Sequence, residues 1–207
     1  MRKLLNVYVV RHGETQWNTE MRSQGRLDSA LTEKGIKDAL SLGDRLKDID
    51  FVRILSSPSG RTVKTAELVK GNRAIQLETD ERLMEIDLGV WQGLTQKEIE
   101  ERDPEAFYAY WNDPSSFRGA KGETFLDVLH RVDEFFADLQ KSLSSGNVLV
   151  VTHGVVIKAL YLLCRKWNID QIWAPPFIHG TSLTIVRIEE GKMELQLEGC
   201  TKHCKES

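Results

Sequence analysis

Two strand-like runs near opposite ends of the chain constrain its fold more than any other feature. Residues 7–10 (VYVV) and 147–151 (NVLVV) are almost entirely β-branched, aliphatic or aromatic, and they lack the polar alternation of a strand that faces water on one side. Such runs are typical of strands buried on both faces, as in a parallel sheet covered by helices. The sequence therefore predicts an α/β fold in which both runs lie inside one sheet.

A histidine and then a glycine follow each of these runs. His12 and Gly13 come after Arg11, and His153 and Gly154 come after Thr152. Ligands of open α/β sheets collect beyond the carboxyl ends of the strands, and a glycine there lets the backbone approach a ligand closely. One such tripeptide is compatible with an ordinary hydrogen-bonded loop histidine. Its repetition at a second strand end favours a shared site.

The rest of the chain alternates helical and strand-like patterns. Helices are expected over 33–47, 60–70, 95–102, 104–112, 125–143 and 155–166, and further strands over 51–55, 75–79, 182–188 and 193–197. The last two strands should form a hairpin. No repeat or linker interrupts this order, so we expect one domain over residues 1–207. The predicted fold is a three-layer α/β/α sandwich, a mostly parallel sheet with helices on both faces.

The turn into the helix that follows strand 51–55 has the features of an anion site. Residues 56–61 (SSPSGR) are rich in serine, and a helix N-terminus exposes unpaired N–H groups with a partial positive charge. Arg61 adds a planar guanidinium that can take two phosphate oxygens at once. A surface arginine is the alternative, but an arginine in the first turn opposes the helix dipole, which favours a functional role.

Two carboxylates, Glu85 and Asp87, lie among apolar neighbours in the segment 81–89. Burial raises the pKa of a carboxyl group and favours its protonated form, which is what a general acid near neutral pH requires. Either residue fits that description, and an exposed loop carboxylate is the alternative for Glu85.

Together these segments resemble the histidine phosphatase superfamily, also called the phosphoglycerate mutase-like family. The resemblance rests on residues 11–15 (RHGET), 57–61 (SPSGR) with 65–66 (TA), the region of Glu85, and 152–154 (THG), and it spans nearly the whole chain. The details are most similar to the bacterial broad-specificity phosphatases of the phosphatase E type. The resemblance implies a phosphoglycerate mutase-like fold and assigns the general acid to Glu85.

The resemblance also implies a phosphate pocket built partly from a long loop over residues 14–31. The residues expected to bind phosphate are Arg11, Asn18, Gln24, Gly25, Arg61 and Gly154. For Asn18 and Gln24 the alternative is ordinary hydrogen bonding within the loop.

Residues 90–122 are expected to form a helical and loop cover inserted over the active site. Aromatic side chains concentrate there, namely Phe107, Tyr108, Tyr110 and Trp111. As a cover they would accept the organic part of a substrate. The alternative is a subdomain that packs onto the sheet.

The chemistry follows from the charge of a phosphomonoester, which is about two negative units, so that a histidine reaches phosphorus only where cations neutralise the oxygens. Arg11 and Arg61 would supply those cations. His12 would attack phosphorus to give a phosphohistidine, and His153 would stabilise the transferring group. Glu85 would protonate the leaving alkoxide and later deprotonate water. No metal or other cofactor is expected.

Three functions fit these residues. The first is a phosphomonoester hydrolase that acts on small organic phosphates. The second is a cofactor-dependent phosphoglycerate mutase, which the shorter connection between Glu85 and Gly122-Glu123 disfavours, because such mutases usually carry a longer insertion there. The third is a non-catalytic phosphoprotein-binding module, which has no use for a general acid. The physiological substrate and the oligomeric state are left open.

Composition limits the partners and the compartment. The formal net charge of −3 argues against a nucleic-acid binder. No apolar run is long enough to span a membrane, and the basic start at 1–5 leads into a strand without a signal cleavage site. Three cysteines without framework spacing indicate a reducing cytoplasm. Residues 200–204 (CTKHC) offer only three metal ligands, so we expect a solvated C-terminal segment there.

Overall fold

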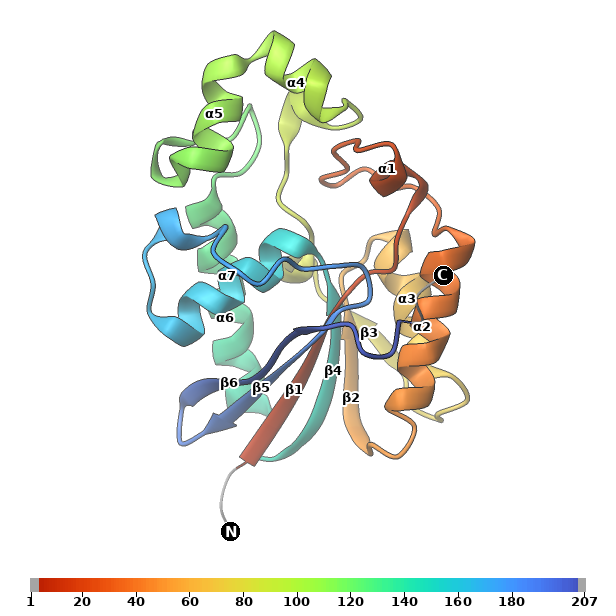
Figure 1. The fold of residues 1–207 in the computed structure, drawn as a ribbon. Coiled ribbons are helices and arrows are strands. Elements are labelled where there is room, and N and C mark those ends of the chain that lie inside the picture. The colour runs from red at the N-terminus through yellow and green to blue at the C-terminus, as the bar shows by residue number, and fades with distance from the viewer. Residues whose placement is uncertain (1–3, 205–207) are drawn as a thin grey trace.

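The computed structural model describes residues 4–204, and it contains one six-stranded sheet (Figure 1). The strands are β1 (Leu4–Arg11), β2 (Phe51–Ser56), β3 (Leu77–Thr79), β4 (Gly146–Thr152), β5 (Leu183–Glu189) and β6 (Lys192–Cys200). Their order is β3-β2-β4-β1-β5-β6. The first four strands in this order are parallel, and β5 runs antiparallel to both β1 and β6. The sheet is therefore mostly parallel, and the predicted hairpin closes one edge.

The helices cover both faces of the sheet (Figure 1). They are α1 (Gln16–Thr19), α2 (Glu33–Arg45), α3 (Gly60–Lys70), α4 (Gln96–Arg102), α5 (Pro104–Asn112), α6 (Phe125–Ser142) and α7 (Gly154–Arg165). Short 3-10 turns lie at Glu81–Leu83, Gly89–Trp91, Pro114–Ser116 and Ile169–Gln171. Helices α6 and α7 pack on one face and α2 and α3 on the other, which gives the predicted three-layer α/β/α sandwich.

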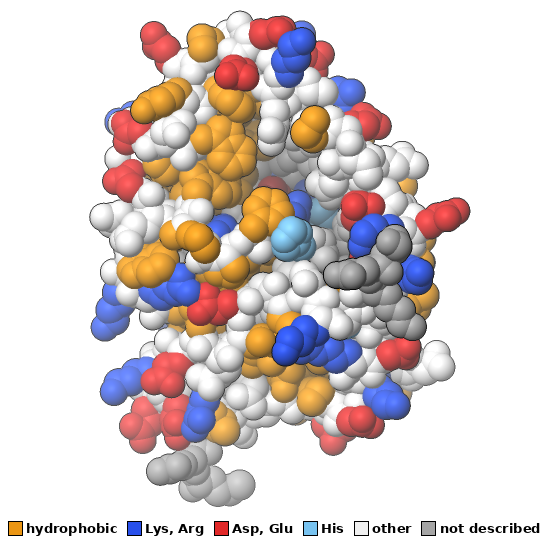
Figure 2. All heavy atoms as spheres, in the orientation of Figure 1, with side chains coloured by type: hydrophobic (Ala, Val, Ile, Leu, Met, Phe, Trp, Pro, Cys, Tyr) orange, Lys and Arg blue, Asp and Glu red, His pale blue; other side chains and the backbone are white. Residues whose placement is uncertain are grey.

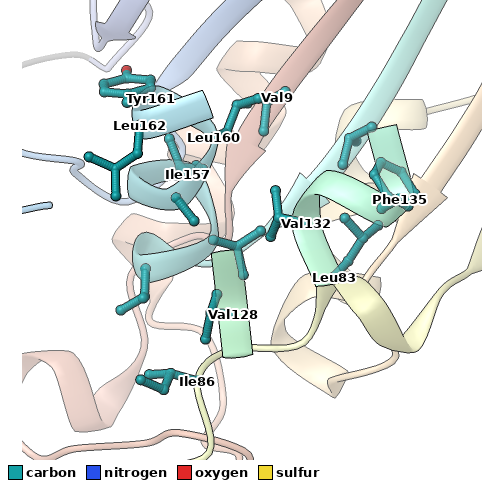
Figure 3. Close-up of a cluster of buried hydrophobic side chains, with 14 of the residues drawn as sticks. Val9, Leu83, Ile86, Val128, Val132, Phe135, Ile157, Leu160, Tyr161 and Leu162 are labelled. Atoms are coloured by element: carbon teal, nitrogen blue, oxygen red, sulfur yellow. The ribbon is translucent and has the colours of Figure 1, made fainter. Parts of the chain in front are cut away.

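The core is divided by the sheet into two parts, because the central strands bury side chains on both faces. Val7 and Val9 of β1 belong to the larger part, with α6 and α7. Val10 belongs to the smaller part, with α2 and α3. Figure 3 shows the larger part, in which Val9 lies near Ile157 and Leu160 of α7. This two-sided burial is the physical reason for the absence of alternation in the sequence.

Two regions position the site at the carboxyl end of the sheet. β1 and β4 are adjacent and in parallel register, and Arg11 pairs with Thr152 at the end of both strands. The histidines that follow these strands are thus brought to the same edge. Helices α4 and α5 stand beyond this edge, away from the three layers (Figure 1). No helix within residues 4–204 has the length and apolar character needed to cross a membrane.

Candidate active site

His12 lies at the exit of β1, and its ring is almost completely buried. Its backbone N–H donates to the carbonyl of Thr152 at 2.9 Å, so the residue continues the β1–β4 pairing. In the side chain, Nδ1 lies 2.8 Å from the carbonyl oxygen of Gly13, which can only accept, so Nδ1 carries the proton. Nε2 is therefore left with a free lone pair. Burial, followed by the charges of Arg11 and Arg61, holds the His12 pKa well below 6.5, so the ring is neutral.

The turn after His12 is fixed by close packing. A Cβ atom on Gly13 would lie 2.8 Å from the carbonyl oxygen of Gly35 in α2, so only glycine fits. The N–H of Gly13 donates to Thr65 Oγ1 in α3 at 3.0 Å. The turn that carries the proposed nucleophile is thus held by two helices on the same face of the sheet.

Arg61, in the first turn of α3, is buried and already surrounded by acceptors. Its Nη1 donates to the carbonyl of Leu27 at 2.7 Å and to Asp28 Oδ1 at 2.8 Å. Its Nη2 donates to the carbonyl of Gly25 at 2.8 Å and lies 3.0 Å from His153 Nδ1. The guanidinium of Arg61 was predicted to bind two phosphate oxygens at once. In the structure, protein acceptors occupy both of its terminal nitrogens. Within residues 4–204 the buried Nε of Arg61 has no partner.

Arg11 presents a second nitrogen of the same kind. Its Nη1 donates to the carbonyl of Ile178 at 2.6 Å, whereas its buried Nε has no partner among residues 4–204. Burial lowers the pKa of Arg11, and the nearby Glu85 carboxyl opposes that shift. A buried N–H without an acceptor is costly, and arginine can only donate. Two such groups beside His12 are the donor set that an oxyanion requires.

His153 follows β4 and is fully buried. Because a guanidinium only donates, His153 Nδ1 accepts from Arg61, and Nε2 carries the proton and lies 2.8 Å from Ser57 Oγ. Burial, then Arg61, holds its pKa well below 6.5. The rings of His153 and His12 are 5.3 Å apart in an edge-to-face arrangement. Both strand ends thus deliver a histidine to one site, but His153 lies behind Arg61 and does not line the open pocket.

Glu85 lines the same pocket and is partly buried. Its Oε1 accepts from the N–H of Ile86 at 3.0 Å, and its Oε2 accepts from the N–H of Val155 in α7 at 3.4 Å. Burial raises the pKa of Glu85, and this effect exceeds the opposing effects of the two amides, Arg61 and Arg11. Burial thus shifts the carboxyl group toward its protonated form, which is the form that a general acid requires.

Asp87 has a different position. Its Oδ1 accepts from the N–H of Gly89 at 2.9 Å and supports a turn, and its own N–H donates to Glu123 Oε2 at 2.9 Å. Asp87 does not line the pocket that contains Glu85. The geometry thus favours Glu85 over Asp87 as the acid.

Asn18 and Gln24 both line the pocket and make local loop contacts at the same time. Asn18 Oδ1 accepts from the N–H of Thr15 at 3.1 Å, which caps α1. Gln24 Oε1 accepts from Ser29 Oγ at 3.1 Å. The local hydrogen bonds use the amide oxygens, which leaves the amide N–H groups for the predicted phosphate binding.

The two predicted phosphate-binding glycines are placed differently. Gly25 lines the pocket and has a left-handed φ of +52°, and its carbonyl oxygen accepts a hydrogen bond from Arg61. Gly154 does not line the pocket. A Cβ atom there would lie 3.8 Å from both Arg11 Nε and Glu85 Oε2. Gly154 therefore lies close to both Arg11 and Glu85, and its part in phosphate binding stays a prediction.

The pocket has a volume of about 450 Å³. One wall comes from the segment 90–122, through Trp91, Ile99, Phe107, Tyr110 and Trp111. Figure 2 shows apolar side chains gathered beside the hollow, with charged and histidine side chains within it. An apolar wall opposite a charged floor suits a ligand with a phosphate at one end and an organic group at the other.

Sequence reasoning missed the opposite wall, which consists of Phe177, His179 and Gly180. These residues lie in an irregular loop before β5, where no periodic pattern marks them. It also missed Asp28 and Ser57 as partners of Arg61 and His153. Asp28 was visible only as a polar loop residue, because its partner is distant in sequence.

The predicted solvated segment at the C-terminus is wrong for the residues that the structure describes. His203 is buried, lies 3.4 Å from Thr181 Oγ1, and its Nδ1 accepts from Arg45 at 3.3 Å. Packing against α2 overrides the polar composition of the tail. Residues 4–204 contain no group of three or more histidine, cysteine or acidic side chains placed to hold a metal ion.

The chain matches one known protein family over most of its length. The model described as histidine phosphatase superfamily (branch 1) matches residues 7–201. The chain belongs to this superfamily. This membership confirms the resemblance drawn from the motifs.

Known relatives are similar over most of the chain. Phosphoserine phosphatase 1 from Hydrogenobacter thermophilus is 30% identical over 203 residues, which cover 98% of this chain and 96% of that protein. A probable phosphoglycerate mutase, GpmB, from Salmonella arizonae is 34% identical over 157 residues, which cover 76% and 73%.

Solved structures share the same fold. Bacillus stearothermophilus YhfR has a TM-score of 0.93 at 42% identity and covers 97% of this chain and 100% of its own. A mycobacterial glucosyl-3-phosphoglycerate phosphatase, solved in complex with VO3, has a TM-score of 0.85 at 29% identity and covers 95% and 98%. The superfamily and the relatives named as phosphatases show that this chain is a phosphatase.

Proposed function

We propose that this phosphatase hydrolyses small organic phosphomonoesters through a phosphohistidine intermediate on His12. One observation carries the proposal: the neutral ring of His12, with a free lone pair on Nε2, lies in a pocket with two buried guanidinium N–H groups that lack a protein acceptor. A nucleophile and an oxyanion site are then adjacent before any substrate arrives.

In the first step, the lone pair on His12 Nε2 attacks phosphorus and the bond from phosphorus to the ester oxygen breaks. Arg11 and Arg61 stabilise the equatorial oxygens through their Nε–H groups. Glu85 gives its proton to the departing alkoxide, so the alcohol leaves neutral. The proton on His12 Nδ1 stays hydrogen-bonded to the carbonyl of Gly13, which stabilises the positive charge that the ring acquires.

In the second step, water attacks the phosphohistidine. Glu85, now a carboxylate, accepts a proton from that water, and His12 leaves as a neutral ring. His153 keeps Arg61 in place during both steps through its bond to Nη2. A direct contact between His153 Nε2 and a phosphoryl oxygen would replace its bond to Ser57.

We propose that the substrates vary widely in their organic part, as in the phosphatase E type. The aromatic wall from residues 90–122 supports this, because apolar surface accepts many organic groups without specific hydrogen bonds. In this proposal the segment 90–122 is the cover of a single domain. The names of the relatives above, which refer to phosphoserine and to glucosyl-3-phosphoglycerate, share only the phosphomonoester.

A phosphoglycerate mutase remains the second candidate, because the relatives from Salmonella carry that name. In a mutase the acceptor in the second step is a bound phosphoglycerate and water is excluded. We also propose that the phosphatase is metal-independent and cytoplasmic, since two arginines neutralise the phosphate and the cysteines suit a reducing compartment.

The test is to trap the intermediate. Wild-type protein given a labelled phosphomonoester and quenched should carry label that is labile in acid and stable in base, whereas His12→Ala should carry none and should not turn over. Equal labelling of both proteins would overturn the proposal. Measured with 3-phosphoglycerate, release of inorganic phosphate should exceed isomerisation, and the reverse result would favour the mutase.

A further inference from the structure

Lys158, one turn after Val155 in α7, is a buried cation without a carboxylate partner. Only 5% of the residue is exposed, and no ion pair to it occurs within residues 4–204. Its Nζ donates to two backbone carbonyls, that of Ala174 at 2.5 Å and that of Pro176 at 2.7 Å. Burying an ammonium group is costly, and two neutral carbonyls compensate for it only partly. Its position therefore calls for a reason beyond stability.

The carbonyls that Lys158 binds belong to a segment that cannot hold itself in place. Pro175 and Pro176 have no N–H group, so this stretch makes no hydrogen-bond ladder of its own. Arg165, also in α7, donates to the carbonyl of Pro175 at 3.4 Å. Two cations of one helix thus fix three successive carbonyls, and Lys158 makes the two shorter contacts.

This segment leads directly into the wall of the pocket that Phe177, His179 and Gly180 form. Phe177 stands 69% exposed at the pocket, and its ring centroid lies 4.8 Å from that of His179. Between them, the carbonyl of Ile178 accepts from Arg11 Nη1. The loop then ends at Thr181, whose N–H donates to the carbonyls of Arg11 and His12 at 3.1 and 3.2 Å. One loop therefore forms a wall for the organic group and also holds a phosphate-binding arginine.

We propose that Lys158 is a positioning residue for substrate binding, and that its ammonium group fixes the loop 174–180 so that the wall and Arg11 are both held in place. The inference rests on the proposed active site, since it requires that substrate occupies the pocket. Lys158 touches neither substrate nor the reacting atoms, so its removal should weaken binding more than it slows the chemical step.

The proposal has a pH signature. Burial, together with the charge of Arg165, lowers the pKa of Lys158 to about 8, and Glu198 of β6 opposes that shift. The ring of Tyr161 in α7 is the other titratable group beside the amine, with its centroid 6.0 Å from Nζ. Above pH 8 the neutral amine keeps its N–H groups but loses the strength of a charged donor. KM should therefore rise above that pH.

Loss of the Lys158 proton weakens substrate binding, but it increases the contribution of Lys158 to folding stability. In the unfolded chain a lysine holds its proton up to its usual pKa of 10.5, whereas in the folded protein Lys158 releases it from about 8. The unfolded state thus binds more protons in this window, and the contribution of Lys158 to stability increases with pH there. A weakening of substrate binding above pH 8 is then not explained by a loss of folding stability from Lys158 itself.

The experiment compares three variants with wild type, using naphthyl phosphate as substrate and inorganic phosphate as competitive inhibitor. In Lys158→Met we expect KM and the inhibition constant of phosphate to rise about tenfold, the size of one charge-assisted hydrogen bond, with kcat changed by less than about threefold. Lys158→Arg keeps the charge and should restore most of the binding. Lys141→Met, which replaces an exposed lysine of α6, should match wild type.

The pH profile completes the test. KM of wild type should rise above pH 8, and KM of Lys158→Arg should not. If Lys158→Met does not fold, the wild-type profile and that of Lys158→Arg still test the inference. Unchanged binding in Lys158→Met, or a wild-type KM that stays flat from pH 7 to 9.5, would overturn the inference. Failure of the proposed function is seen separately, as full activity in His12→Ala.

Discussion

His153 Nδ1 lies 3.0 Å from Arg61 Nη2, and both side chains are buried. With Leu27, Asp28 and Gly25, this contact engages the two terminal nitrogens of Arg61 completely and leaves only Nε for a ligand. The guanidinium is thus oriented before substrate binds, and no reorganisation is required when charge develops on phosphorus.

Arg61→Lys should therefore be severely impaired although the charge is retained. An ammonium group cannot satisfy four acceptors and also present an N–H group to phosphate. We expect kcat/KM to fall by the equivalent of about 2 kcal/mol or more, the size of a lost hydrogen bond to a charged group. Steady-state kinetics with an aryl phosphate measure this loss. Near-wild-type kcat/KM would show that Arg61 is peripheral.

Asp28 allows a graded version of that test. Its carboxylate accepts from both the backbone N–H and Nη1 of Arg61, and it is partly exposed. Asp28→Asn keeps an oxygen acceptor, so its loss of kcat/KM should be smaller than that of Arg61→Lys. A larger loss would mean that Asp28 has a role of its own in the reaction.

The two buried histidines should make the protein sensitive to acid. The pKa of His12 and that of His153 lie well below 6.5 in the folded protein, so only the unfolded chain takes up protons there as the pH falls through 6.5. Stability that is present above pH 6.5 is then lost on acidification. Between about pH 7.5 and 5.5, wild type should lose about 1.4 kcal/mol more unfolding free energy than His153→Asn.

Urea unfolding at the two pH values measures this difference. Glu85, whose pKa is raised, contributes a trend of opposite sign, and this contribution cancels in the comparison because Glu85 is present in both proteins. Equal losses in wild type and His153→Asn would show that His153 is not held in its neutral form.

Most of the fold could be predicted because its signals are local. The absence of polar alternation in β1 and β4 reports burial on both faces, and threonine caps mark the starts of three helices. Thr32, Thr95 and Thr124 each accept a backbone N–H at the start of α2, α4 and α6. The edge strand β3 is shorter than expected, because only Leu77–Thr79 pair with β2.

The site could be predicted only in part, because many hydrogen-bond partners of its side chains are backbone atoms. The sequence places Arg61 at a helix N-terminus, but the carbonyls of Leu27 and Gly25 that occupy its terminal nitrogens have no signature in side-chain chemistry. The wall formed by Phe177 and His179 depends on how an irregular loop folds back over α7. Burial of His203 depends likewise on a distant helix.

The segment that carries Glu85 is secured by an ion pair with low exposure. Arg131 of α6 donates through Nε and Nη2 to the two carboxylate oxygens of Glu123, and through Nη1 to the carbonyl of Arg82. Arg131→Met should leave Glu123 without this partner and lower the unfolding free energy by about 3 kcal/mol. Thermal and urea unfolding measure the loss.

A neighbouring residue provides the control. His130 is exposed and faces Glu134 in the same helix. His130→Ala should change stability by less than about 0.5 kcal/mol. If both variants lost equal stability, the effect would belong to α6 in general and not to the Arg131–Glu123 pair.

Glu85 is the predicted donor of the proton to the leaving group. An alkoxide is a poor leaving group and needs a proton as the ester bond breaks, whereas a nitrophenolate departs with little help. Glu85→Gln keeps the size of the side chain and removes its acid. It should therefore reduce the hydrolysis of alkyl phosphates about a hundredfold more than that of aryl phosphates with acidic phenols.

The pH dependence should change in the same variant. Burial raises the pKa of Glu85, so alkyl phosphate hydrolysis by wild type should decline as pH rises through that pKa. Glu85→Gln should lose this decline. The matched comparison is Asp87→Asn, which alters the other carboxylate of the segment and should retain both the decline and the preference among leaving groups. If Glu85→Gln slowed both substrate types by the same factor, Glu85 would be positioning phosphate or water, and Asp87 would become the next residue to test.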